Sequence, residues 1–158
     1  MRENYKLDKI DKKILSFLIE DARQPFLDIA KTIYVSGGTI HVRFRKMVEK
    51  GIIKGSTLII DPEKIGFDIF AFVGINLHNA KDYKIVIEKI KKIPEIMEAY
   101  YTTGKYNIFV KLFAKNTKDL YNILIRKIQE ISEIQSTETL LSLETAFEKK
   151  ISTLVEIA

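Results

Sequence analysis

Basic side chains, glycines and hydroxyls gather in one short stretch of the 158-residue chain, residues 36–46. Gly37 and Gly38 would let backbone N–H groups approach a phosphate at the start of a helix, where the helix dipole also favours an anion. Charge-assisted hydrogen bonds to phosphate could come from three basic side chains further along, Arg43, Arg45 and Lys46. The stretch therefore predicts a DNA contact, with an ordinary solvated helix face as the alternative.

The apolar residues Ile40, Phe44 and Met47 recur at helical spacing and would form the buried face of this helix. The opposite face would carry Gly38, Val42 and Arg45, flanked by Thr39 and Lys46, with His41 at its edge. The candidate DNA-binding residues are Ser36, Gly37, Gly38, Thr39, His41, Val42, Arg43, Arg45 and Lys46.

A second polar cluster, residues 102–107, combines hydroxyls, a glycine and an amide between two apolar runs. It could bind a small polar ligand, but Gly104 and Asn107 also suit a plain β-turn. The polar run from Gln135 to Thr139 raises the same question, because a half-exposed edge strand alternates in this way too.

Catalysis has little support in the sequence. The chain has no cysteine and two histidines, His41 and His78, and no metal-binding spacing, phosphate loop or nucleophile motif is recognisable. We therefore predict a protein that is not an enzyme and carries no metal or other cofactor. Scattered carboxylates leave a metabolic enzyme subunit open as an alternative.

Three short helices would position the basic stretch. Asp8 or Asp11 can cap a first helix that ends before residues 21–25, and a second, short helix follows from Phe26 to Ile33. The break at residues 34–38 then precedes the third helix, which Gly51 would stop. This order predicts a helix-turn-helix DNA-binding domain over residues 1–52 and a linker strand over 53–66.

The remaining residues, 67–158, alternate between strand and helix patterns. We expect strands at 69–77, 97–103, 107–113 and 135–143, with helices at 82–93 and 117–131. This βαββαβ order predicts a ferredoxin-like domain, so the whole chain would be α+β. Its sheet would carry both helices on one face and leave the other, with Phe70, Phe72, Phe109 and Leu141, to be covered by another subunit.

Charge and composition agree with this division. The net charge is +5, and residues 1–66 hold 13 basic against 9 acidic side chains, while residues 67–158 hold 13 against 12. The absence of cysteine and of a long apolar run, together with the lack of a signal-peptide core near Met1, predicts a cytoplasmic protein outside the membrane.

Several segments of the sequence resemble the Lrp/AsnC family of regulators. The resemblance begins in residues 7–30, continues through the run from Val35 to Arg43 and through 51–53 and 61–62, and returns in 98–104 and 133–140. It covers nearly the whole chain. It implies a winged or three-helix DNA-binding domain tethered to a ferredoxin-like effector domain, and dimers that form tetramers or octamers.

The same resemblance implies a free amino acid bound between dimers. Many relatives carry acidic residues where this chain has Lys105 and Asn107, but the asparagine-responsive branch also lacks acids there. Asparagine is the first expectation, and another polar or acidic amino acid stays open because Lys105 replaces a histidine of that branch. The expected effector-binding residues are Tyr100, Thr102, Thr103, Gly104, Lys105, Tyr106, Asn107, Gln135, Ser136 and Thr137. An architectural DNA-binding protein without an effector is the further alternative.

Overall fold

A computed structural model describes residues 5–149, which divide into a unit built on residues 5–59 and a unit of residues 60–146. The ends of the two predicted domains, 1–4 and 150–158, lie outside the described residues. The domain boundaries at 52 and 67 stay predictions.

The first helix, α1 (Lys9–Glu20), begins at a capping box. The Asp8 carboxylate accepts hydrogen bonds from the N–H groups of Ile10 and Asp11, while the Asp11 carboxylate accepts one from the N–H of Asp8. Ile14 and Leu15 on the inner side of the helix are buried. The sequence signal for this helix start is thus confirmed.

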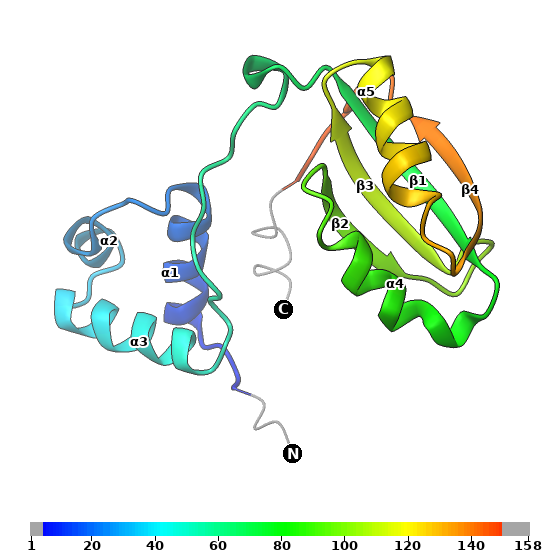
Figure 1. Cartoon of the computed structure of the whole chain (residues 1–158). Coiled ribbons are helices and arrows are strands. Elements are labelled where there is room, and N and C mark those ends of the chain that lie inside the picture. Colours follow the sequence, from blue (N-terminus) through cyan, green and yellow to red (C-terminus); the bar gives the residue numbers. More distant parts are fainter. Residues whose placement is uncertain (1–4, 150–158) are drawn as a thin grey trace. The chain divides into compact units, whose positions relative to one another are not determined.

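The second and third helices, α2 (Phe26–Thr32) and α3 (Gly37–Glu49), enclose a small apolar core with α1 (Figure 1). The chain leaves α2 through Tyr34, whose φ of 59° is left-handed, and the N–H of Val35 then bonds to the carbonyl of Ala30. This motif reverses the chain within a few residues. The predicted helix-turn-helix order is therefore present.

The predicted linker strand over residues 53–66 is wrong. Gly51 ends α3 with a φ of 70°, and the N–H groups of Ile52 and Ile53 both bond to the carbonyl of Met47. Beyond them the described chain runs without a strand to a 3₁₀ turn, η1 (Glu63–Ile65). β-branched residues favour a strand only where a neighbouring strand supplies hydrogen bonds, and this segment has no such neighbour in the described chain.

The second unit has the predicted βαββαβ order, so the α+β class is confirmed. Its sheet is antiparallel, and its strands lie side by side in the order β2 (Ile96–Tyr101), β3 (Ile108–Ala114), β1 (Ile69–Leu77) and β4 (Ile134–Leu141). A 3₁₀ turn, η2 (Ala80–Asp82), precedes the helix α4 (Tyr83–Ile90). The helix expected over 117–131 begins as α5 (Thr117–Asn122) and continues as wider π-helical turns, η3 (Ile123–Ile128). In chain order the elements of this unit after η1 are β1, η2, α4, β2, β3, α5, η3 and β4.

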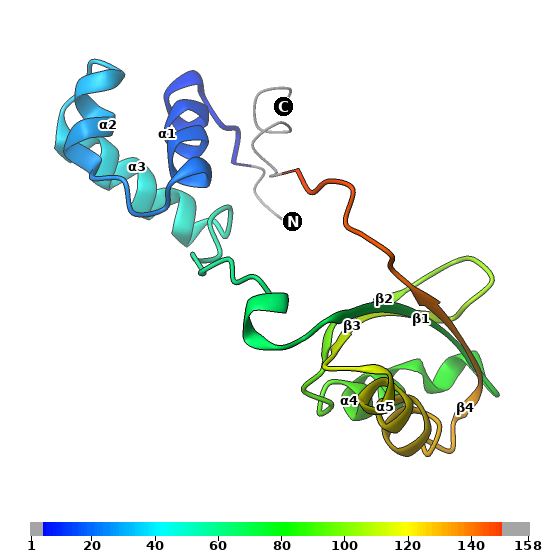
Figure 2. The same ribbon diagram turned by 90° about the horizontal axis from the view of Figure 1, so that it is seen from above.

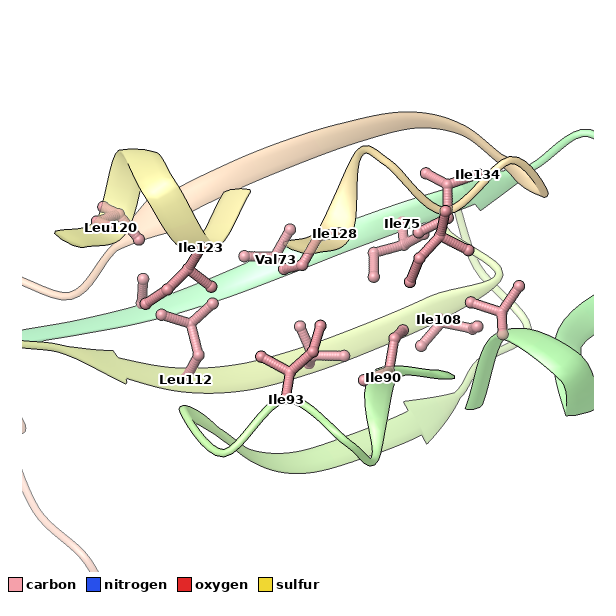
Figure 3. Packing of buried hydrophobic residues seen from close by; sticks show 14 of the residues in the cluster. Val73, Ile75, Ile90, Ile93, Ile108, Leu112, Leu120, Ile123, Ile128 and Ile134 are labelled. Carbon is pink, nitrogen blue, oxygen red and sulfur yellow. The ribbon is translucent and has the colours of Figure 1, made fainter. Parts of the chain in front are cut away.

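Both helices cover the same face of this sheet (Figure 2). Alternate strand residues such as Val73, Ile75 and Ile108 point to the helices and are fully buried with Ile90 and Ile123 (Figure 3).

No helix among residues 5–149 has the length and apolar character needed to cross a membrane.

The other face of the sheet is aromatic, and we call it the open face. Phe70 stacks on Phe113 at a centroid distance of 5.1 Å, and Phe72 stacks on Phe109 at 5.6 Å. All four rings are only partly buried. The structure thus confirms that Phe70, Phe72 and Phe109 share this face, which lacks a covering layer from the described chain. The prediction for Leu141 is wrong, because Leu141 pairs with the buried Ala71 of β1 and lies on the helix side, while Leu140 pairs with Phe72.

Candidate functional site

The N-terminus of α3 is held by its own hydroxyls. Ser36 Oγ accepts a hydrogen bond from the N–H of Thr39 at 3.1 Å, and the two hydroxyl oxygens are 2.9 Å apart. Ser36 therefore caps the helix, as serine commonly does, and its hydroxyl is bonded to that of Thr39. Gly38 beside them is exposed, whereas a Cβ on Gly37 would lie 2.9 Å from Leu27 Cδ2, so Gly37 also serves the packing of α2.

The outer face of α3 lies where the helical spacing places it. Val42 is 68% exposed, and Gly38, Arg45 and Lys46 are exposed with it. His41 lies at the edge, with its ring 4.7 Å from that of Phe26. This face presents two cations and little bulk, which suits entry into a DNA groove.

Arg43 is held differently from the other basic residues of α3. Its Nη1 donates to Asp8 Oδ2 at 2.5 Å and to Asp11 Oδ1 at 2.9 Å. The backbone N–H of Asp11 and the Arg43 guanidinium hold the pKa of Asp8 below its ordinary value. The guanidinium is thus engaged within the domain, and the prediction that it meets phosphate stays a prediction.

Tyr34 is a candidate that the sequence reasoning missed. It lies in the turn before α3, is 94% exposed and adopts a left-handed backbone that glycine would occupy at lower cost. A tyrosine hydroxyl can bond to DNA phosphate. In the sequence, Tyr34 could have been noticed only by its position in the turn before Val35-Ser36, where a small residue such as glycine would be expected.

The loop of residues 102–107 joins β2 to β3 and is anchored to the sheet. Asn107 Oδ1 accepts a hydrogen bond from the N–H of Leu77 at 2.9 Å, and the N–H of Asn107 donates to the carbonyl of Ile75. The hydroxyl of Thr102 donates to the carbonyl of Tyr106. Asn107 and Thr102 therefore shape the loop, while Thr103 and Gly104 at its tip are exposed.

Tyr106 folds back over the open face. A Cβ on Gly74 would lie only 2.5 Å from Tyr106 Cγ, so the ring needs glycine at that position of β1. The Tyr106 hydroxyl donates to Glu138 Oε2 at 2.5 Å, and Lys105 Nζ donates to the same oxygen at 2.5 Å. The loop thus brings a cation, a phenol and a carboxylate together above the sheet.

Hydrogen bonding tunes the two charges of this cluster. The Lys105 ammonium and then the Tyr106 hydroxyl hold the pKa of Glu138 below its ordinary value, and Glu138 raises the pKa of Lys105. Both groups are therefore charged near neutral pH. They can bind the two ends of a zwitterion.

The other expected effector residues divide between the two faces of the sheet. Ser136 shares the open face with Glu138, because they pair with Asn76 and Gly74 of β1, and Ser136 Oγ accepts from the Asn76 amide at 3.3 Å. Tyr100 also lies on the open face, where its hydroxyl donates to Glu98. Thr137 points to the helix side and accepts from Gln129, whereas Gln135 is exposed at the start of β4.

Two residues of this site are absent from the expected effector-binding residues. Glu138 is the carboxylate of the cluster, and Gly74 makes room for Tyr106. The alternation of β4 places Glu138 on the same face as Ser136, and a glycine inside an apolar strand signals a close approach. Among residues 5–149 no group of three metal-ligating side chains could hold a metal ion.

Comparison with known proteins gives the same two parts. Residues 7–54 match the model of a winged helix-turn-helix DNA-binding domain, and residues 70–151 match the Lrp/AsnC ligand-binding domain. The chain belongs to the Lrp/AsnC family. It is a DNA-binding transcriptional regulator with an amino-acid-binding domain, and not an enzyme. No β wing forms in the described residues before η1.

Relatives of this family cover almost the whole chain. The regulatory protein AsnC of Haemophilus influenzae is 51% identical over 89% of this chain and 93% of its own length. Escherichia coli AsnC is 45% identical over 94% and 98%, and its solved structure superposes with a TM-score of 0.90 over 94% of this chain and 99% of that one. A regulator from Neisseria meningitidis in complex with L-Met shares the fold, with a TM-score of 0.86 at 20% identity over 93% and 96%.

Proposed function

We propose that this regulator binds duplex DNA through the exposed face of α3, assembles through the open face of its sheet, and senses a free amino acid at the cluster of Lys105, Tyr106 and Glu138. Asparagine is the first candidate. The single observation that carries the sensing role is the pair of opposite charges held on one loop and one strand above the open face. As a regulator of transcription it would act in the cytoplasm, on genes of amino-acid metabolism.

The DNA-binding proposal depends on the outer face of α3. Gly38 and Val42 leave its centre free of long side chains, Arg45 and Lys46 supply charge, and Tyr34 lies in the turn that precedes it. Lys46 Nζ is also 5.0 Å from the centre of the Tyr5 ring, which holds the cation beside the helix.

Replacing Arg45 by alanine should weaken binding to the protein's own upstream DNA, because a phosphate or base contact is lost. Loss of a base contact would cost about 1–3 kcal/mol of binding free energy. Loss of a phosphate contact would lower the magnitude of the slope of log affinity against log salt concentration by about one. Fluorescence anisotropy against this DNA and a random duplex measures both. Lys118→Ala on the exposed side of α5 is the control of equal charge change and should leave binding intact. Binding of wild-type protein no tighter to the upstream DNA than to random duplex would refute the regulatory proposal.

The sensing proposal depends on an exchange of ion pairs. Lys105 and Glu138 now bind each other at an exposed position, where a pair of this kind contributes little. An amino acid placed between them could offer its α-ammonium to Glu138 and its carboxylate to Lys105, while the loop tip at Thr103 and Gly104 offers backbone groups for an amide side chain. The L-Met complex of the Neisseria meningitidis regulator supports an amino acid as the class of ligand.

Calorimetry with asparagine, aspartate, glutamine and leucine tests this proposal, and asparagine should bind. Lys105→Ala removes a charge-assisted hydrogen bond and should weaken asparagine binding by about tenfold, the equivalent of about 1.4 kcal/mol. Lys118→Ala is again the control. No heat with any of the four at millimolar concentration would contradict amino-acid sensing, whereas an unchanged affinity in Lys105→Ala would contradict only the assigned role of this lysine.

The assembly proposal depends on the phenylalanines of the open face. Stacked rings such as Phe72 and Phe109 form a partly exposed apolar surface, and surfaces of this kind commonly mark sites of protein association. A second copy of the same sheet can cover this surface through matching contacts.

Multi-angle light scattering of the full chain should show at least a dimer at micromolar concentration. Phe72→Glu should shift the chain toward monomer, because it would bury a charge in an apolar interface. Tyr121→Glu, at an exposed aromatic of α5 in the helix layer, should leave the mass unchanged. A monodisperse wild-type monomer would overturn the proposal.

A further inference from the structure

We propose that Arg43 supports DNA binding as a positioning residue, because it neutralises Asp8 and Asp11 beside the outer face of α3 and does not contact phosphate. The proposal rests on the DNA-binding role of α3 argued above. It separates Arg43 from Arg45, its neighbour two residues along the same helix.

The guanidinium of Arg43 is engaged within the domain. One nitrogen, Nη1, bonds to both Asp8 and Asp11, at 2.5 and 2.9 Å, and the Arg43 side chain is only 27% exposed. The Asp11 side chain is 1% exposed and also accepts the Tyr5 hydroxyl at 2.9 Å. A buried carboxylate needs its cation, because the charged form is otherwise poorly solvated. If Arg43 turned to phosphate, Asp11 would lose that cation.

The two carboxylates lie beside the outer face of α3. A hollow of about 520 Å³ is lined by Asp8, Asp11 and Arg43 together with Tyr5, Lys6 and residues of the outer face of α3. The α3 residues in its wall include Gly38, Thr39, Val42 and Lys46. DNA that approaches this face therefore approaches two carboxylates, and like charges brought together oppose binding. Arg43 offsets this repulsion from within the domain.

Arg43 also joins two helices of the domain. Asp8 caps α1 and Asp11 lies in its first turn, so the guanidinium ties the start of α1 to the middle of α3. Arg43 thus fixes how the third helix docks on the first. Loss of Arg43 would both loosen this contact and uncover the carboxylates, and each change weakens DNA binding without removing a phosphate contact.

The dependence of binding on salt separates the two roles of an arginine. Each phosphate contact contributes a slope of about −0.9 to a plot of log affinity against log salt concentration, because counterions are released. We expect Arg43→Met in the full chain to weaken binding to a duplex from its own upstream DNA and to keep the wild-type slope. If Arg45 contacts phosphate, Arg45→Met will lower the magnitude of the slope by about 0.9 and so calibrate the measurement.

Removal of a carboxylate provides the second readout. Asp8→Asn keeps a capping side chain and should restore much of the lost affinity in the Arg43→Met background, with a clearly smaller gain in the Arg45→Met background. A slope reduced by about 0.9 in Arg43→Met, with equal effects of Asp8→Asn in both backgrounds, would overturn the proposal and leave the DNA-binding role of α3 in place.

A further variant covers the case in which Arg43→Met melts at a much lower temperature. Arg43→Met combined with Asp8→Asn and Asp11→Asn contains none of the three charges, so no carboxylate is left buried without a partner. The proposal predicts a wild-type slope for this variant and an affinity clearly higher than that of Arg43→Met. A slope smaller by about 0.9 would show that Arg43 contacts phosphate. Failure of wild-type protein to bind the duplex would contradict the DNA-binding role itself.

Discussion

One face of the four-stranded sheet has no covering layer from residues 5–149, and the regulator's assembly and sensing are both proposed to depend on this face. Two helices bury the inner face of the central strands β1 and β3, while the outer face carries stacked phenylalanines and the loop between β2 and β3. An apolar face of this kind is stable in water when a partner covers it. The proposed assembly would therefore follow from how the sheet is built, and a ligand bound above the same face would alter how subunits meet.

The polar cluster above the open face shows how a ligand site can form from ordinary packing. Gly74 leaves room for the Tyr106 ring, the ring brings its hydroxyl to Glu138, and Lys105 closes the cluster from the loop. No part of this arrangement requires a deep pocket in one chain. The charges lie at the surface, where a second subunit would exclude water and strengthen their interaction with a ligand.

Much of the fold was predictable from the sequence, because periodicity and capping residues act locally. The capping box at Asp8, the stop at Gly51 and the order of strands and helices after Ile69 all follow from such patterns. The linker strand failed because a strand depends on a neighbour that composition does not reveal. The change to π-helical turns after Asn122 likewise has no signal in the apolar spacing.

The sites were less predictable, because the role of a charged side chain depends on distant partners. Arg43 and Arg45 look alike in sequence, yet only Arg43 reaches Asp8 and Asp11, which lie more than thirty residues away. Thr137 was grouped with Ser136 although adjacent strand residues point to opposite faces. The period of two was available to separate them, and it also pointed to Glu138.

An amino acid that regulates DNA binding must change the affinity for DNA, and DNA must then change the affinity for the amino acid. The most direct measurement is calorimetry of asparagine binding to the protein alone and to its complex with the upstream duplex. Linkage predicts that the two dissociation constants differ, by the same factor by which saturating asparagine changes the affinity for DNA. Equal dissociation constants would contradict the claim that the effector regulates DNA binding.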